Sequence, residues 1–202
     1  MGRTGAALVA IACWAGLILN FVATYRAGHD SVATLWILAR YFTILTNFFL
    51  AILMTWVAFG GRPSASMLGG LTLAILLVGV VYAILLKGMF ELSGPAAISD
   101  FLLHDVTPAM MAAWWLLFAP RAKLRWKDAL WWCAYPLAYL AYALVRGSMD
   151  GRYPYHFIDV PDLGWLQTAL NAGGISAGFI IAGLGLIWID SWRPLGSRRY
   201  SR

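Results

Sequence analysis

The chain has 202 residues, of which 61% are hydrophobic and only 12% are charged. Soluble domains average about 25% charged residues, so this composition excludes an ordinary soluble domain, and the high apolar content excludes a disordered chain. Two cysteines are too few for a secreted disulfide scaffold. The net charge of +6 does not point to nucleic acid, because the charges fall in short clusters between long apolar runs.

Six apolar runs of about 20 residues follow one another, and this is the length that a helix needs to cross a bilayer. We expect helices at about 5–25, 35–59, 67–86, 98–119, 129–145 and 166–189. The connections between the runs are short and leave no room for a separate soluble domain. The sequence therefore predicts an all-α polytopic membrane protein, in which residues 1–202 form a single six-helix transmembrane domain.

The basic residues predict the orientation of these spans. The N-terminus, the second and fourth loops and the C-terminal tail together carry ten of the 15 Lys and Arg residues. Because cytoplasmic loops collect positive charge, we expect both termini in the cytoplasm and the protein in the plasma or inner membrane. The four arginines of the tail at 193–202 are expected to contact anionic lipid headgroups. The oligomeric state is left open by the sequence.

A small group of polar side chains lies inside the predicted spans, where ionisable and amide groups are costly and usually functional. The group consists of Asn20, Arg40, Thr43, Thr46, Asn47, Asp100, His104, Asp105 and Asn171. With the predicted orientation, all of these residues fall in the outer half of the membrane. The sequence therefore predicts a polar pocket on one side of the bundle.

Thr43 and His104 are predicted to lie at the same depth in this pocket. Thr43 is seven residues below the outer end of its span and His104 is six below that of its own, roughly 10 and 9 Å at the rise of a helix. On the second predicted helix, Arg40, Thr43 and Asn47 share one face because of their i, i+3, i+7 spacing. A hydroxyl and an imidazole can therefore sit at the same level in the membrane.

These residue types suit nucleophilic catalysis. The Thr43 hydroxyl is a candidate nucleophile and His104 a candidate proton acceptor. Pro108 cannot donate to the carbonyl of His104, so we expect a kink and a freed carbonyl there. The imidazole is then oriented either by Asp100, four residues earlier, or by that carbonyl. The candidates for stabilising an oxyanion or holding a carboxylate are Asn20, Arg40 and Asn47.

The fifth loop, residues 146–159, is polar, aromatic and on the predicted outer side. Its Tyr153-Pro154-Tyr155 motif favours an extended backbone, since the residue before a proline avoids helical geometry. Such a segment suits a lid over the mouth of the bundle, and it suits a simple solvated hairpin equally well.

Four short motifs occur in order over nearly the whole chain. They are Leu19-Asn20-Phe21, Arg40-Tyr41-Phe42-Thr43, His104 followed by Pro108, and Tyr153-Pro154-Tyr155. With them the chain resembles the androgen-induced and androgen-dependent TFPI-regulating family of six-helix membrane proteins, and within it the bacterial Pr-six-Pr branch.

The resemblance implies a threonine hydrolase that cleaves fatty acid esters of hydroxy fatty acids and releases fatty acids. It implies that Thr43 is the nucleophile and that His104 is the general base and acid. The chain departs from the animal members at Asp100-Phe101, where they have Asn-His, and at Asp105, where they have Thr. The resemblance therefore does not carry over the group that orients His104.

Two main hypotheses follow from these observations. The first is a lipid esterase, whose membrane lipid or fatty acid ester substrate reaches the site laterally and which needs no metal and no cofactor. Its expected supporting or substrate-binding residues are Asn20, Arg40, Asn47, Asp100, Asp105, Tyr153, Tyr155 and Asn171. The second is a non-enzymatic lipid-binding sensor or transporter, in which Arg40 and Asn171 hold an anionic headgroup. Haem-based electron transfer is disfavoured, because it normally needs paired membrane histidines.

Overall fold

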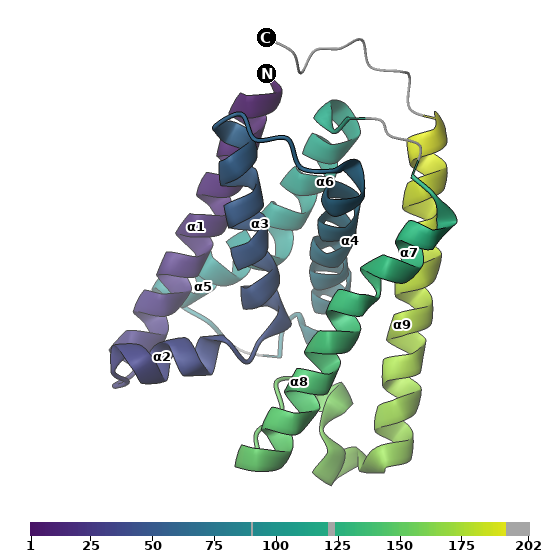
Figure 1. Ribbon diagram of the computed structural model, residues 1–202. Helices are drawn as coiled ribbons and strands as arrows, with labels where there is room; N and C mark the ends of the chain where they lie inside the picture. The colour runs from purple at the N-terminus through teal and green to yellow at the C-terminus, as the bar shows by residue number, and fades with distance from the viewer. Residues whose placement is uncertain (90, 121–123, 193–202) are drawn as a thin grey trace. The chain divides into compact units, whose positions relative to one another are not determined.

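The computed structural model of the chain describes residues 1–89, 91–120 and 124–192 (Figure 1). Within these ranges the chain forms helices and turns and no strand, which confirms the all-α prediction. The helices belong to two compact units, one of described residues up to 120 and one of residues 124–192. That the two units act as a single transmembrane domain stays a prediction.

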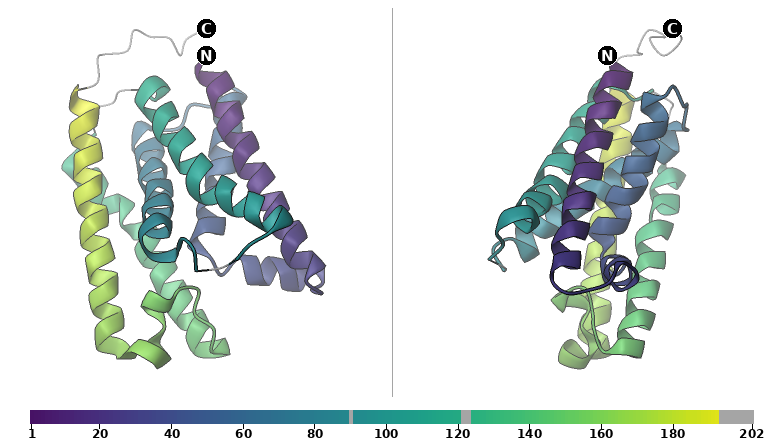
Figure 2. Two further views of the ribbon diagram at one scale, coloured as in Figure 1. Left: turned by 180° about the vertical axis from the view of Figure 1, so that it is seen from behind. Right: turned by 90° about the vertical axis from the view of Figure 1, so that its left-hand side faces the viewer.

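The first unit is built around four long helical segments. Its helices are α1 (Gly2–Arg26), α2 (Ser31–Leu38), α3 (Phe42–Ala58), α4 (Ala65–Val81), α5 (Gly94–Phe101) and α6 (Thr107–Phe118). Helix α1 contacts α3, α5 and α6, and α4 contacts α3 and α6; Figure 2 shows from behind how α5 leads into α6 beside α1. Leu50, Met54, Ile75 and Met111 are fully buried between these helices.

Lipid tails are as apolar as the core side chains, so the hydrophobic effect contributes little between helices in a membrane. These helices are therefore held together mainly by close packing. Gly16 of α1 provides one such approach. A Cβ atom at Gly16 would lie 2.5 Å from Cδ2 of Leu103, so only glycine lets Leu103 sit there. This contact brings the segment that carries His104 against α1.

The run predicted as one helix at 35–59 instead forms two helices, and this corrects the sequence-based prediction. Helices α2 and α3 are bent by 99° relative to each other at a short break (Figure 1). Helix α2 has its own beginning, because the Asp30 side chain accepts a hydrogen bond from the Ala33 amide at 2.8 Å, as an N-cap does. The bend places Thr43 in the first turn of α3.

Two short π-helical turns interrupt the spans that follow. Helix α4 continues into η1 (Tyr82–Leu86), and α5 is joined to α6 by η2 (Leu102–Val106). The predicted runs at 67–86 and 98–119 therefore correspond to the segments α4–η1 and α5–η2–α6. A π-turn widens the helix locally and occurs often at functional sites, so η1 and η2 mark where to look for one.

The second unit contains the remaining helices. They are α7 (Trp126–Trp132), α8 (Ala134–Asp150), the 3-10 turn η3 (His156–Ile158) and α9 (Val160–Trp192). Helix α8 ends at Gly151, which adopts the left-handed conformation with φ of 68° that glycine tolerates best. Gly164, with φ of 75°, separates the first turn of α9 from the long helix that the sequence predicted at 166–189.

In the described part of the chain, four segments are long and apolar enough to cross a membrane, and the bent pair α2–α3 is a fifth if it counts as one span. The four are Gly2–Arg26, Ala65–Leu86, Gly94–Phe118 and Val160–Trp192. The run predicted at 129–145 forms α7 and α8, which do not belong to this set. These segments indicate a helical membrane protein. The basic tail at 193–202 lies outside the described residues.

Candidate active site

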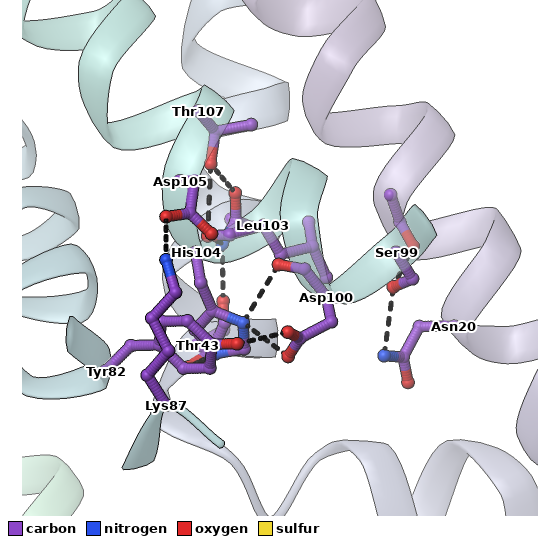
Figure 3. A network of polar contacts seen from close by, with 12 residues as sticks. Asn20, Thr43, Tyr82, Lys87, Ser99, Asp100, Leu103, His104, Asp105 and Thr107 are labelled. Atoms are coloured by element: carbon purple, nitrogen blue, oxygen red, sulfur yellow. Dashed lines mark hydrogen bonds and ion pairs between the residues drawn. The ribbon is translucent and has the colours of Figure 1, made fainter. Parts of the chain in front are cut away.

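The structure brings Thr43 and His104 together from two segments that lie far apart in the chain. Thr43 lies in the first turn of α3, and its Oγ is 3.2 Å from Nε2 of His104 in η2 (Figure 3). Thr43 is buried, and 16% of the His104 side chain is exposed. The pair that the sequence predicted at one depth is thus within hydrogen-bond distance.

The other imidazole nitrogen faces Asp100. His104 Nδ1 lies 3.0 Å from Oδ1 of Asp100 and 3.1 Å from the backbone carbonyl oxygen of the same residue. Both neighbours are acceptors, so the neutral ring carries its proton on Nδ1 and leaves Nε2 to accept from the Thr43 hydroxyl. Sequence analysis offered two groups that could orient the imidazole, Asp100 and the freed carbonyl of His104. In the structure Asp100 is the one at Nδ1 of the ring. Thr43, His104 and Asp100 form a hydroxyl–imidazole–carboxylate chain.

The π-turn η2 explains how His104 reaches this position ahead of a proline. Pro108 has no amide hydrogen to donate to the His104 carbonyl, and the wider turn before it relieves the mismatch without breaking the helix. A Cβ atom at Gly79 of α4 would lie 3.1 Å from Pro108 and 3.3 Å from the His104 carbonyl oxygen. The small size of Gly79 therefore lets α4 approach η2 closely.

Asn47, one turn after Thr43 on α3, joins α3 to η2. Its side-chain nitrogen donates to the Thr43 carbonyl at 3.0 Å and to the Leu103 carbonyl at 3.2 Å, and its oxygen accepts from the Thr107 hydroxyl at 2.7 Å. Both amide hydrogens are therefore engaged, and none is left for an oxyanion. The role of Asn47 in this structure is to hold the backbone of Thr43 against the backbone next to His104.

Sequence analysis missed two members of this network. Tyr82 stacks on the His104 ring with 4.1 Å between centroids, and its hydroxyl donates to Oδ2 of Asp100. Thr107 donates to Asn47 and also to the Leu103 carbonyl at 3.2 Å. Both residues sit in apolar runs where Tyr and Thr are common. The spacing of Thr107, three residues after His104, was the one available signal.

Two other predicted residues lie in the same unit without joining the Thr43–His104 pair. Asp105 forms an ion pair with Lys87 at 3.1 Å on an exposed edge next to the site. Asn20 donates to the Ser99 hydroxyl at 3.0 Å, and Ser99 donates to a carbonyl of α1 at 2.9 Å, so this pair links α1 to α5 (Figure 3).

Arg40 does not share a helix face with Thr43, and this corrects the predicted i, i+3, i+7 arrangement. Arg40 lies in the break between α2 and α3, where its amide donates to the Ile37 carbonyl at 3.1 Å. Only Thr43 and Asn47 keep the helical relationship. The depth of Thr43 was counted along a continuous helix, and it stays a prediction. Arg40 is buried.

The remaining predicted residues belong to the second unit. Asn171 of α9 donates to the Phe157 carbonyl at 2.9 Å and accepts from Gln167 at 2.8 Å. It therefore holds the segment around η3 against α9. Tyr155 stacks on Phe157 with 5.1 Å between centroids, and Tyr153 packs against Gly147 at the end of α8. In this structure these residues order the fifth loop.

Among the described residues, no group of three or more His, Cys, Asp or Glu side chains is arranged to hold a metal ion. The side chains at the Thr43–His104 pair are a hydroxyl, an imidazole, a carboxylate and a phenol. Comparison of the chain with models of known protein families, with curated proteins and with solved structures found no match.

Proposed function

We propose that this protein is an intramembrane threonine hydrolase that cleaves lipid esters. The observation that carries the proposal is the 3.2 Å contact between Thr43 Oγ and His104 Nε2, in a ring whose Nδ1 faces Asp100. A nucleophile, a base and a group that orients the base are the parts of a catalytic triad, whatever fold supplies them. The preferred substrate class is a fatty acid ester of a hydroxy fatty acid.

The chemistry runs in two half-reactions. The Thr43 oxygen attacks the ester carbonyl carbon while its proton passes to Nε2 of His104. The tetrahedral intermediate collapses, the C–O bond to the alcohol breaks, and His104 returns the proton to the leaving alkoxide. His104 Nε2 then takes a proton from water as the water oxygen attacks the acyl-threonine carbonyl. The bond between the acyl carbon and Thr43 Oγ breaks, His104 returns the proton to Thr43 Oγ, and the fatty acid leaves. Throughout both steps Nδ1–H stays directed at Asp100, which stabilises the imidazolium.

The transition-state oxyanion needs a donor other than the amides that the sequence favoured. Asn47 is bonded to two carbonyls and Asn20 to Ser99, so neither supports the proposal in this role. Thr43 occupies the first turn of α3, and the N-terminal end of a helix carries a partial positive charge. The negative charge that develops on the oxyanion beside Thr43 is therefore stabilised by the N-terminal end of α3.

The membrane setting favours a lipid substrate. The helices that carry Thr43 and His104 are apolar on their outer surfaces, with Phe48, Ile52 and Phe101 among the exposed side chains. A lipid ester dissolved in the bilayer reaches such a site laterally and brings its carbonyl to the buried hydroxyl. We propose that the chain crosses a plasma or inner membrane six times, with α7–α8 as the fifth span and both termini in the cytoplasm.

Turnover by the purified protein tests this proposal. The wild-type chain in lipid nanodiscs is incubated with lipid esters, including a fatty acid ester of a hydroxy fatty acid, and the released acid is quantified. Thr43→Val keeps the shape of the side chain and removes the hydroxyl, so hydrolysis should fall to background, and His104→Gln should do the same. Hydrolysis by Thr43→Val at the wild-type rate would exclude Thr43 as the nucleophile. Wild-type protein that binds lipid but turns over no ester would favour the lipid-sensor hypothesis instead.

A further inference from the structure

The strongest feature of the site that the two half-reactions do not use is Tyr82, the first residue of the π-turn η1. Its ring lies on the His104 ring with 4.1 Å between centroids and 16° between planes. Its hydroxyl donates to Oδ2 of Asp100, while Nδ1 of His104 lies 3.0 Å from the other carboxylate oxygen, Oδ1. Tyr82, Asp100 and His104 thus form a closed triangle of three contacts (Figure 3).

We propose that Tyr82 is a positioning residue, which fixes the carboxylate of Asp100 and the ring of His104 so that Nε2 points at Thr43. The kinetic part of this inference rests on the proposed hydrolase. The geometric part, a hydroxyl that locks the Asp100–His104 pair, does not depend on any reaction.

The first step of the argument concerns Asp100. A carboxylate has two oxygens, and in surroundings of low polarity an oxygen without a donor is costly. His104 donates to one carboxylate oxygen and Tyr82 donates to the other. Rotation of the carboxylate would therefore break two charge-assisted hydrogen bonds at once. Tyr82 therefore holds Oδ1 where Nδ1 of the imidazole needs it.

The second step concerns the imidazole. A histidine ring on one side of a helix swings about its side-chain bonds unless neighbours restrict it. The Tyr82 ring covers one face of His104, so the imidazole cannot leave its plane without losing the stack. Restriction of this kind keeps the base near the geometry that proton transfer needs. The Tyr82 ring would therefore increase the rate of hydrolysis by orienting His104, without taking part in any bond that forms or breaks.

The third step concerns the local fold. Tyr82 opens η1, and the amide of Lys87 donates to the Tyr82 carbonyl at 2.8 Å, five residues back, as a π-turn requires. The Lys87 ammonium lies 5.9 Å from the centre of the Tyr82 ring and pairs with Asp105 beyond it. Gly79, one turn before Tyr82, gives α4 its close approach to η2. The π-turn and the glycine together place the Tyr82 ring against His104.

The experiment separates the hydroxyl of Tyr82 from its ring. Tyr82→Phe keeps the stack and removes the donor to Asp100, whereas Tyr82→Leu removes both. We expect kcat for ester hydrolysis to fall by about ten- to a hundredfold in Tyr82→Phe, and further in Tyr82→Leu, with KM unchanged. Tyr25→Phe is the matched control, because Tyr25 also lies near the outer end of a span but stacks on Phe21. Its kcat should equal that of the wild type.

A spectroscopic readout makes the inference independent of turnover. In protein labelled with nitrogen-15 on histidine, the Nδ1–H resonance of His104 is identified by its loss in His104→Gln. Tyr82→Phe should displace this resonance, and Tyr25→Phe should leave it unchanged. Difluorotyrosine at position 82 keeps the ring and the hydroxyl while making the hydroxyl a stronger donor, so it should move the resonance in a chain that folds as the wild type does.

The outcomes are distinct. An unchanged His104 resonance in both Tyr82→Phe and the difluorotyrosine protein would overturn the inference, as would a rise in KM with kcat unchanged, which would make Tyr82 a substrate-binding residue. If the wild-type protein turns over no ester, the proposed hydrolase fails, but the displacement of the resonance still decides whether Tyr82 locks the Asp100–His104 pair.

Discussion

The hydroxyl of Thr43 and the Nε2 atom of His104 lie 3.2 Å apart although the two residues are 61 positions apart in the chain. Thr43 reaches this position because α3 begins with a sharp bend, and His104 because a π-turn precedes Pro108. Both the bend and the π-turn depart from the regular geometry of a membrane helix. Local departures of this kind persist where the surrounding structure holds them in place, and they gather at functional sites.

Replacing Asp100 with asparagine should slow catalysis while leaving the fold intact. The amide keeps the size of the side chain but removes the charge that faces Nδ1 of His104 at 3.0 Å, and it leaves a single acceptor oxygen for the two donors, His104 and Tyr82. We expect kcat for ester hydrolysis to fall by about a hundred- to ten-thousandfold. Steady-state hydrolysis at saturating substrate measures this effect.

Asp105→Asn provides the matched control for that substitution. Asp105 follows His104 directly, but its carboxylate pairs with the exposed Lys87 ammonium at 3.1 Å. An exposed ion pair contributes at most about 1 kcal/mol, so kcat and stability should change little. Equal losses of kcat in Asp100→Asn and Asp105→Asn would show that general loss of negative charge, and not orientation of the imidazole, explains the effect.

The Asn47–Thr107 contact should stabilise the join between α3 and η2. Asn47→Leu removes the donor to two carbonyls and the acceptor for Thr107, and Thr107→Val removes the partner hydroxyl. We expect each variant to lower the free energy of unfolding by about 1–2 kcal/mol. Reversible unfolding in mixed micelles measures these values. The double variant should lose less than the sum of the two, and strictly additive losses would argue against a shared network.

Gly16→Ala should disturb the site from a distance. The added methyl group would lie 2.5 Å from Leu103 Cδ2, and Leu103 directly precedes His104. We expect lower stability and slower hydrolysis, because the buried Leu103 side chain would have to give way next to His104 in η2. Gly173→Ala is the control, since nothing lies within 4 Å of a Cβ atom there and alanine favours a helix by about 0.5–1 kcal/mol over glycine. If Gly16→Ala were as stable and active as Gly173→Ala, the close contact between Gly16 and Leu103 would not be needed for stability or hydrolysis.

Helix α2 should lie along the membrane surface. It is bent by 99° from α3, and Val32, Leu35 and Trp36 expose apolar surface. Spin labels placed singly along α2 and α3, in a chain whose two cysteines are replaced by alanine, report depth through their accessibility to oxygen and to a nickel chelate. Depth should stay nearly constant along α2 and then change by about 1.5 Å per residue along α3. A steady change from residue 32 onward would instead indicate one continuous span.

The sequence was sufficient for the class of protein and for the central pair of the site. Charge and apolar length predict helical spans, and depth counting placed Thr43 and His104 at one level even though the second span is not continuous. Arg40 was assigned to the Thr43 face because an apolar run carries no signal for a 99° bend. The Ala33 amide donates to the Asp30 side chain at the start of α2, and an aspartate at this position was the available hint.

Tyr82 could not be found from the sequence for a different reason. A tyrosine near the end of an apolar span is typical of the membrane interface, so its presence does not separate an anchor from a site residue. The contact with His104 depends on a π-turn and on the small Gly79, and neither leaves a periodic pattern. Asn47 shows the converse, since its position was predicted but its hydrogen-bond partners were visible only in three dimensions.

The site of covalent modification tests the central claim most directly. The protein in nanodiscs is treated with a fluorophosphonate, which reacts with activated hydroxyl nucleophiles, and the modified peptide is sequenced by mass spectrometry. The proposed triad predicts a single adduct on the Thr43 oxygen, which is lost in Thr43→Val, is strongly reduced in His104→Gln and persists in Asp105→Asn. An adduct on another residue, or equal labelling of wild type and Thr43→Val, would contradict it.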